Sequence, residues 1–419
     1  MGRRRFLNLV VREYGSRIYS LCRLDPSKHL FYPSAAAAQE ATKSAPLSDA
    51  KSNAKKTQKN RGSGGVSTMA STTAAGTTFC NRPPRTEINF QESPTLGIAF
   101  AWVTASRGRD SSDPAAYHMF ASLLGDGGGG GESGSADDVV HFADASGHTA
   151  VYDAGTKSVV TMPSSSIRVA METATLSTTT SEGESCLYVM DLAPNPWANH
   201  DPCRFEALVY RRDDLSHPPV RPYYAMMGWR WYRRALQSPP FLADPEYRRT
   251  RNKMPAYALG TYAFDTAEQE WRHAGKWLLP FAGRAELVPE LGLWFGLSAS
   301  SPHGSLCALD LSNATSADME DSERPASALR HSWDVDLGLP EGCNGWLPFA
   351  EHLVNLGAGR FCVARCFEPV KRKKTDAEIT VLTGVEVSRC EDDGEDAVRM
   401  TKHRSMVYRL QNHSIKHVF

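Results

Sequence analysis

The dominant feature of this sequence is a succession of short β-rich runs, each bounded by turn-forming residues. About twenty strand candidates are present when the weaker runs are included. Patterns with the period of an amphipathic helix are scarce, and the clearest one covers a turn or two around Leu347–Leu356. Many short strands at near-regular spacing predict an all-β sandwich, barrel or propeller. The stronger candidates are Phe6–Val11, Ile18–Leu24, Val139–Phe142, Thr149–Tyr152, Cys186–Met190, Phe205–Tyr210, Tyr257–Phe264, Leu291–Leu297, Leu306–Leu311, Arg360–Phe367, Ile379–Val387 and Met406–Leu410.

A weak internal repeat favours the propeller among these architectures. In its clearest copy a strand ends at Asp265, a polar turn follows, and Trp271 opens the next strand. The Asp carboxylate can accept hydrogen bonds from backbone amides of the turn and so close a hairpin. The large aromatic side chain then packs between neighbouring sheets. Copies with the same spacing run from Asp153 to Val159 and from Asp25 to Phe31.

Two looser copies keep the strand and its Asp, at Asp191 and Asp310, but carry long insertions before their aromatic candidates Trp229 and Trp333. Surface loops tolerate such insertions at small cost. The alternative interpretation is a chance recurrence of Asp at strand ends. On the repeat interpretation the chain is one all-β propeller of six blades, while the strand count leaves five or seven blades open.

Two segments have a composition too poor in large apolar side chains to offset the entropy of ordering. Residues 34–84 are rich in Ala, Ser, Thr, Gly and Lys, and we expect a disordered insertion there. Residues 125–138 contain five consecutive glycines and predict a flexible loop. The propeller would then comprise residues 1–33 and 85–412.

The two ends of this sequence carry strand-like runs. We expect Phe6–Val11 and Ser405–Leu410 to meet in one blade, followed by a C-terminal tail at 413–419. The tail contains His413 and His417, which have the spacing of a helical metal-binding pair, but a solvated pair is the favoured interpretation.

The composition offers little support for catalysis or for binding to nucleic acid or membranes. Forty-seven basic and forty-seven acidic residues leave no net charge to attract polyanions. None of the nine Cys forms a C-x-x-C pair, and neither G-x-S-x-G nor H-E-x-x-H is present. No run is long and apolar enough to cross a membrane. We therefore expect a monomeric protein that is not an enzyme, with no cofactor and no metal site.

Two basic clusters are candidate recognition elements. Arg230, Arg233 and Arg234 alternate with Trp229, Trp231 and Tyr232, a pattern that suits a nucleic-acid or acidic-partner surface as well as a solvated blade edge. The run Lys371, Arg372, Lys373 and Lys374 indicates either a nuclear import signal or an unremarkable basic loop. The expected location is accordingly cytoplasmic, nuclear or both.

The Asp-turn-Trp unit at Asp265 and Trp271, followed by Trp277–Pro280, resembles the blades of plant kelch-type and F-box-associated propellers. The phrases Phe6–Val11, Leu24–Phe31, Phe205–Tyr210 and Gly283–Gly296 resemble an uncharacterised domain-of-unknown-function family of grasses. These likenesses imply a kelch-like fold and carry no known activity. We expect the protein to be a non-catalytic protein-interaction scaffold of unknown partner, with an adaptor-like role. The alternative is an enzyme or a small-ligand binder that uses the central channel.

Overall fold

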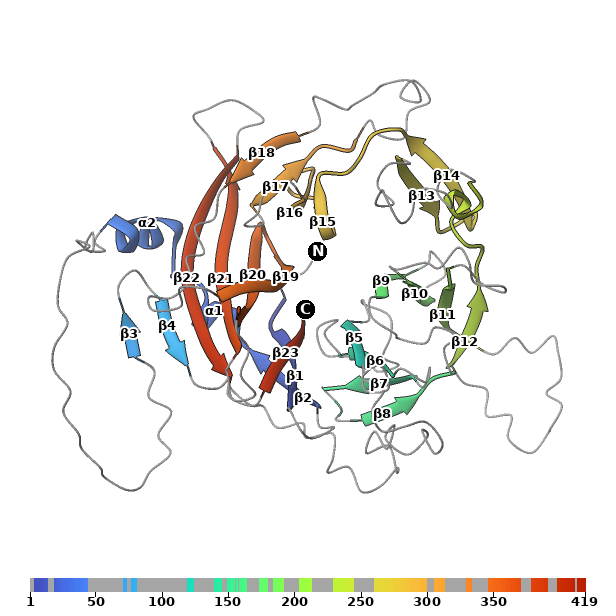
Figure 1. The fold of residues 1–419 in the computed structure, drawn as a ribbon, viewed down its shortest axis with the longest axis horizontal. Helices are drawn as coiled ribbons and strands as arrows, with labels where there is room; N and C mark the ends of the chain where they lie inside the picture. Colours follow the sequence, from blue (N-terminus) through green and yellow to red (C-terminus); the bar gives the residue numbers. More distant parts are fainter. Residues whose placement is uncertain are drawn as a thin grey trace. The chain divides into compact units, whose positions relative to one another are not determined.

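The structure is a computed structural model of the chain, and its elements are shown in Figure 1. It describes residues 4–13, 19–43, 71–73, 77–80, 119–123, 139–144, 149–154, 156, 158–163, 173–179, 184–191, 203–212, 229–244, 260–299, 305–312, 329–333, 346–370, 378–390, 398–410 and 413–419. These residues group into two compact units. Unit 1 comprises Met1–Asn89, Pro280–Leu311 and Ser327–Phe419, and unit 2 comprises Phe90–Leu279 and Ser312–Ala326.

Unit 2 contains three antiparallel sheets in which strands adjacent in sequence are adjacent in space. The first has the order β5-β6-β7-β8, with β5 Met119–Leu123, β6 Val139–Asp144, β7 Thr149–Asp153 and β8 Ser158–Thr161. The second has the order β12-β11-β10-β9, with β9 Thr173–Thr179, β10 Ser185–Asp191, β11 Phe205–Arg212 and β12 Trp229–Ala235. The third pairs β13 Thr261–Asp265 with β14 Glu270–Gly275, and a 3-10 helix spans Pro240–Ala243.

Unit 1 also contains three sheets. One has the order β15-β16-β17-β18, with β15 Phe281–Val288, β16 Leu293–Ser298, β17 Leu306–Leu309 and β18 Leu329–Trp333. A six-stranded sheet has the order β19-β20-β21-β22-β4-β3, with β19 Trp346–Gly357, β20 Arg360–Pro369, β21 Glu378–Arg389, β22 Val398–Leu410, β4 Thr77–Cys80 and β3 Ser71–Thr73. The third has the order β2-β1-β23, with β1 Leu7–Glu13, β2 Tyr19–Leu24 and β23 His413–Val418. Helices α1 Pro26–His29 and α2 Ala35–Lys43 complete the unit.

The fold is a β-propeller, which confirms the fold class predicted from strand density. Strands that are neighbours in sequence pair antiparallel within the sheets, as short strands at regular spacing lead one to expect, while β4 pairs in parallel with β22 and β1 pairs with β23 from the other end of this sequence. The described residues form six sheets, a number within the range of five to seven blades that the sequence allows.

Both ends of this sequence contribute to the sheet β2-β1-β23, as expected, but the C-terminal partner differs from the prediction. β1 pairs with β23, and the backbone N–H of Asn8 donates to the carbonyl of Phe419 at 2.7 Å. Ser405–Leu410 belongs instead to β22 in the six-stranded sheet. The expectation of a tail at 413–419 was wrong, because Ile415 and Val418 bury apolar side chains there.

The expected disordered insertion at 34–84 contains ordered elements. Ala35–Lys43 forms α2, since a run of four alanines has high helix propensity and Ala38 is fully buried. Thr77–Cys80 forms β4, which pairs in parallel with β22. The rest of the insertion and the glycine-rich loop at 125–138 lie outside the described residues.

The helical pattern expected around Leu347–Leu356 was also wrong, because these residues form β19. β19 pairs with β20 along its length, and register shifts occur between Pro348 and Ala350 and between Asn355 and Gly357. Each shift interrupts the alternation of side chains between the two faces of the sheet. Apolar residues consequently fall at intervals that resemble a helix.

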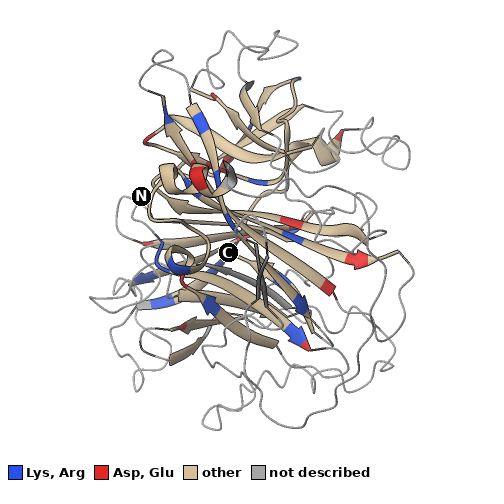
Figure 2. Cartoon of the chain, turned by 90° about the vertical axis from the view of Figure 1, so that its left-hand side faces the viewer, with Lys and Arg blue, Asp and Glu red and all other residues tan. Residues whose placement is uncertain are grey.

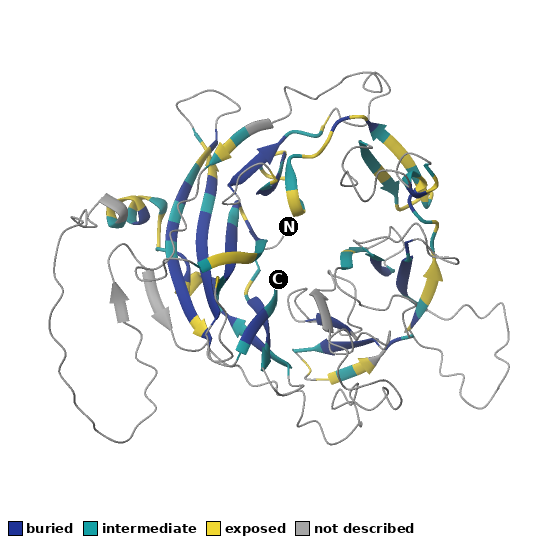
Figure 3. Ribbon diagram, in the orientation of Figure 1, coloured by how far each residue is buried: buried dark blue, intermediate teal, exposed yellow. Residues whose placement is uncertain are grey.

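Each unit has its own apolar core, and the buried residues that form it are the dark blue stretches of the strands in Figure 3. In unit 1 one cluster joins Leu9 of β1, Leu382 of β21 and Tyr408 of β22, all of which are buried. In unit 2 another joins Leu187 of β10 with Leu208 of β11. Burying each such side chain contributes about 1.5–3 kcal/mol, so these clusters hold the sheets that display the residues considered next.

Candidate functional site: an arginine surface on a rigid blade

The turn after Asp265 has the hydrogen bonds described for the repeat. Asp265 Oδ1 accepts from the backbone N–H of Glu268 at 3.1 Å and of Ala267 at 2.9 Å, and these bonds lower the pKa of its carboxyl group. Trp271 lies in β14, where its Nε1 donates to the carbonyl of Gln237 at 2.9 Å. Its ring packs against Phe264 at a centroid distance of 5.0 Å. The Asp265 carboxylate therefore closes the hairpin, and Trp271 connects the hairpin to the backbone at Gln237.

Two other repeat residues also close connections between paired strands. Asp153 Oδ1 accepts from the backbone N–H of Thr156 at 3.1 Å, and Val159 follows in β8. Asp191 Oδ2 accepts from the backbone N–H of Arg204 at 3.2 Å and so closes the base of a long connection. The next strand opens at Phe205, so the assignment of Trp229 as its aromatic partner was wrong.

The copy at Asp25 lacks the hairpin geometry, and the copy at Asp310 differs in where its aromatic residue lies. Asp25 caps the N-terminus of α1, accepting from the backbone N–H of Ser27 at 3.1 Å. The following Pro suits the first turn of a helix, so the chain turns into α1 rather than back into a strand. Phe31 is buried outside any strand. Asp310 follows β17, and Trp333 ends β18 instead of opening it.

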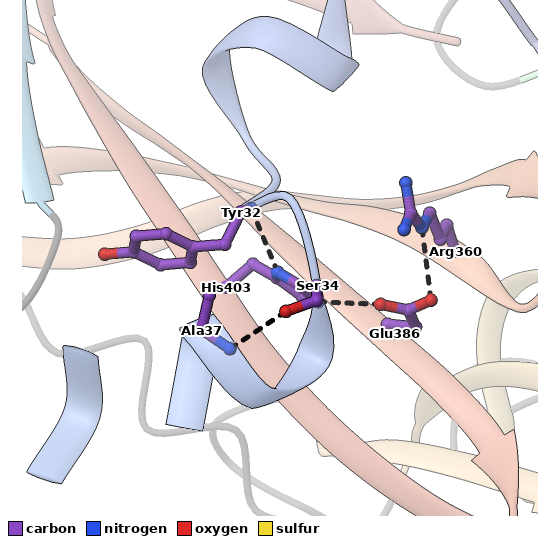
Figure 4. Close-up of polar contacts among 6 residues, drawn as sticks. All are labelled: Tyr32, Ser34, Ala37, Arg360, Glu386 and His403. Atoms are coloured by element: carbon purple, nitrogen blue, oxygen red, sulfur yellow. Dashed lines mark hydrogen bonds and ion pairs between the residues drawn. The ribbon is translucent and has the colours of Figure 1, made fainter. Parts of the chain in front are cut away.

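A network of buried and partly buried charged residues in unit 1 was not anticipated from the sequence (Figure 4). The Glu386 carboxylate accepts from His403 Nε2 at 2.9 Å and from Arg360 Nε at 3.2 Å. His403 Nδ1 accepts from the backbone N–H of Tyr32 at 3.2 Å. Since Nδ1 is an acceptor, the imidazole proton lies on Nε2 and points to Glu386. Burial lowers the pKa of His403, and the bond to Glu386 opposes this effect.

The same network anchors the segment that carries α1 and α2. The Arg360 guanidinium lies 4.9 Å from the centroid of the Phe31 ring, and the Arg404 guanidinium lies 4.5 Å from that of Tyr32. The backbone N–H of Arg404 donates to the carbonyl of Leu30 at 3.0 Å. Figure 4 shows the bond from Tyr32 to His403 and the bond from the backbone N–H of Ala37 to the Ser34 hydroxyl, 3.1 Å long, at the start of α2. Glu386 and His403 thus use their polar atoms to position this segment.

The histidines singled out in the sequence lie in a strand. His413 and His417 belong to β23, so the helical spacing expected of a metal-binding pair does not apply. The neighbouring His352 has its pKa lowered to about 4, chiefly by burial and also by His417. Among the residues that the structure describes, no group of three or more His, Cys, Asp or Glu side chains could hold a metal ion.

The arginines of β12 lie on an exposed strand at one end of the sheet β12-β11-β10-β9 (Figure 1). Trp231 is buried and its ring packs against Tyr210 at a centroid distance of 5.1 Å. Arg233 lies on the same face as Trp231, 4.0 Å from the buried Glu206 carboxylate. This face of β12 is therefore fixed against the core.

The opposite face of β12 carries Arg230, Tyr232 and Arg234, because side chains alternate along a strand. Arg230 and Arg234 are exposed. Arg211 of β11 lies directly opposite Arg230, and its guanidinium lies 4.7 Å from the centroid of the Tyr232 ring. We call these four residues, Arg211, Arg230, Tyr232 and Arg234, the arginine surface. It brings two of the three arginines from the predicted cluster together with one that the sequence analysis missed.

Charge elsewhere is mixed. On the face shown in Figure 2, Lys and Arg (blue) and Asp and Glu (red) both occur among the strands. The basic run Lys371, Arg372, Lys373 and Lys374 lies outside the described residues. No helix of the described part of the chain is long and apolar enough to span a membrane.

Comparison with known proteins places the sequence in a family. Residues 133–408, more than half of the chain, match the model of a family described as a protein of unknown function (DUF1668). This match confirms the expected likeness to a domain-of-unknown-function family. No curated protein matches the sequence. The chain therefore belongs to the DUF1668 family.

Proposed function

We propose that this protein is a non-catalytic protein-interaction scaffold that presents the arginine surface to a partner. The observation that carries the proposal is the pair of faces on β12. One face is held in the core through Trp231, while the other displays Arg230 and Arg234 around Tyr232. Arg and Tyr are enriched among the residues that dominate binding energy at protein interfaces. A strand with one face fixed also loses little conformational freedom on binding.

We also propose that the protein is not an enzyme, because the polar atoms of the Glu386–His403 network are already engaged in hydrogen bonds within the chain. Glu386 accepts from both His403 and Arg360, and His403 also accepts from the backbone of Tyr32. Groups engaged in this way hold the chain together and have few atoms left for substrate. The same argument is why we propose no cofactor for this network.

The finer part of the proposal rests on likeness. The unit from Asp265 to Trp271 resembles blades of plant kelch-type and F-box-associated propellers. We therefore propose an adaptor-like scaffold of plant origin that acts in the cytoplasm, the nucleus or both.

Affinity purification from native tissue, followed by mass spectrometry, tests the proposed function. The bait is the full chain, compared with the double variant Arg230→Glu/Arg234→Glu and with Arg409→Glu, a control at an exposed arginine of β22 in the other unit. We expect a reproducible protein partner with the full chain and the control, and its loss with the double variant. Failure to recover any reproducible protein partner would overturn the proposed function.

A further inference from the structure

We propose that His403 holds the segment Leu30–Tyr32 on the six-stranded sheet while its imidazole is neutral, and releases this segment when the imidazole is protonated. This inference goes beyond the proposed function and is independent of it, because all of the residues involved lie in unit 1. The observations that carry it are a bulge in β22, the two hydrogen bonds of the imidazole and the charges that surround the ring.

His403 lies in a β-bulge of β22. In the pairing of β21 with β22, the single residue Gly384 lies opposite two residues, His403 and Arg404. A bulge of this kind redirects side chains and removes a backbone group from the ladder. Here the N–H of Arg404 donates to the carbonyl of Leu30 at 3.0 Å, and Gly384 has no side chain to obstruct that carbonyl. The bulge is therefore the place where the segment Leu30–Tyr32 meets the sheet.

The imidazole of His403 has a different partner on each nitrogen (Figure 4). Nδ1 accepts from the backbone N–H of Tyr32 at 3.2 Å, and Nε2 lies 2.9 Å from the Glu386 carboxylate. Only a neutral imidazole has an acceptor nitrogen, because both nitrogens of an imidazolium are donors. Protonation therefore places an N–H at Nδ1 against the N–H of Tyr32, while the bond from Nε2 to Glu386 persists. The hydrogen bond to Tyr32 and the charged form of His403 exclude each other.

The His403 side chain is fully buried while the segment is in place. The ring centroid of Phe31 lies 5.0 Å from that of the imidazole, and the ring centroid of Tyr32 lies 6.2 Å from it. Within the part of the chain that the structure describes, no acceptor lies against Nδ1 to receive a second proton. A buried donor without an acceptor is costly. Release of the segment gives Nδ1 access to water, so the released state binds the proton more tightly, and this difference in affinity shifts the equilibrium.

The charged groups that face His403 act in opposite directions. Glu386 of β21 favours the imidazolium, whereas Arg360 of β20 and Arg404 of β22 oppose it. Burial is the largest influence and, with the two arginines, holds the pKa of His403 below its ordinary value of 6.5. The two guanidinium groups also lie over the aromatic rings of the segment, at 4.9 and 4.5 Å. The charged side chains described in α1 and α2 are exposed: Lys28, His29 and Glu40.

Release of the segment should therefore accompany mild acidification. Above pH 6.5 the imidazole is neutral in the bound and the released states, so the bound state keeps its full advantage. Below pH 6.5 the released state takes up a proton that the bound state does not bind until its lowered pKa is reached. Because one proton is involved, the equilibrium moves by at most about tenfold per pH unit. Release uncovers the bulge and frees the backbone N–H of Arg404 from the Leu30 carbonyl.

Hydrogen exchange of the full chain, followed by mass spectrometry at pH 7 and pH 5, tests this inference. The quantity compared is the protection factor, which corrects the observed rate for the intrinsic pH dependence of exchange. We expect the protection of Leu30–Tyr32 to fall by about tenfold, while the core strand β20 of the same unit stays protected. An unchanged protection factor at Leu30–Tyr32, or a fall that β20 shares in full, would overturn the inference.

Two variants separate the titration of His403 from a general weakening of the segment. Glu386→Gln removes the carboxylate that favours the imidazolium, so release should move to lower pH. His403→Gln removes the titrating group, so the protection of Leu30–Tyr32 should no longer depend on pH. His29→Gln, at an exposed position in α1, is the control and should release the segment at the same pH as the unaltered protein. Release that persists in His403→Gln, or that does not move to lower pH in Glu386→Gln, would count against the inference.

The nitrogen chemical shifts of the His403 ring give a readout that needs no variant of the network. At pH 7 the proton should lie on Nε2, as the hydrogen bonds of the ring require. The titration midpoint of His403 should coincide with the midpoint for release of Leu30–Tyr32. A proton on Nδ1 at pH 7, or two clearly different midpoints, would show that His403 does not control the segment.

Discussion

His403 donates its Nε2 proton to the Glu386 carboxylate at 2.9 Å, across the neighbouring strands β22 and β21. Arg360 of β20 donates to the second oxygen of the same carboxylate at 3.2 Å. Three consecutive strands of the six-stranded sheet are therefore joined through one acidic side chain. Since Tyr32 donates to the other imidazole nitrogen, this acid also controls how the segment after β2 is held.

Glu386→Ala should destabilise unit 1, because it leaves the buried His403 donor and the mostly buried Arg360 without their acceptor. Losing the partner of a buried or charged group costs about 1–3 kcal/mol. Glu386→Gln should cost less, since its amide carbonyl can still accept from His403. Urea unfolding monitored by circular dichroism checks both variants. Equal stability of Glu386→Ala and the full chain would contradict the role given to this acid.

Buried histidines should make the protein less stable in mildly acidic solution. Burial lowers the pKa of His141 to about 3 and that of His352 to about 4, below the ordinary value of 6.5. As the pH falls below 6.5 the unfolded chain takes up protons that the folded chain does not, so the free energy of unfolding falls with decreasing pH. The window for His352 runs from about pH 6.5 down to about 4. Each such histidine contributes a slope of up to about 1.4 kcal/mol per pH unit.

Unfolding measured at pH 7 and pH 5 checks this dependence. His352→Gln should reduce the loss of stability between the two pH values, because the variant has no imidazole to protonate. His29→Gln, at an exposed position in α1, is the control and should keep the full pH dependence. A loss of stability that is unaffected by His352→Gln would show that this imidazole does not cause it.

Gly384→Ala should loosen the segment that carries α1. A Cβ at this position would clash with the backbone carbonyl of Leu30, which cannot retreat like a flexible side chain. Overpacking of this kind costs about 1–3 kcal/mol. We expect faster amide hydrogen exchange at Arg404, whose backbone N–H donates to the carbonyl of Leu30, and at Leu30, whose own N–H donates to the carbonyl of Pro26 in α1. Ser388→Ala, at an exposed position of β21, is the matched control and should exchange like the full chain.

The sequence predicts strands and turns correctly where the residues that determine them lie within a few positions of one another. The turn at Asp265 is such a case, since the carboxylate, the polar turn and the following Trp271 all lie within one hairpin. Asp25 carries the same local pattern, but the following Pro26 directs the chain into α1. The spacing of Asp and aromatic therefore predicts a turn, and the residue after the Asp decides which turn forms.

The charged network and the arginine surface depend on pairing that a single sequence does not reveal. Glu386 and His403 lie on different strands, and Tyr32 is far from both in sequence. Arg211 joins the arginine surface only through the register that places it opposite Arg230. A register is fixed by burial along whole strands. Local composition could therefore identify the β12 cluster but not its partner on β11.

The C-terminal strand β23 is expected to be essential for folding. Ile415 is 1% exposed and Val418 is 6% exposed, and both lie in the core cluster that contains Leu9 of β1. The backbone of Phe419 also exchanges two hydrogen bonds with Asn8, at 2.7 and 3.0 Å. Removing β23 would expose these apolar side chains and leave one edge of β1 without its partner.

Truncation after Leu410 should therefore yield protein that is insoluble or that lacks a cooperative thermal transition. Ile415→Asp should have a similar effect, because it places a charge among buried apolar groups. Ile415→Val, the matched control, removes only a methylene group and should lower the free energy of unfolding by about 1 kcal/mol. Soluble expression and thermal unfolding distinguish these outcomes. A truncated chain that melts cooperatively at the same temperature as the full chain would mean that residues 413–419 behave as a tail after all.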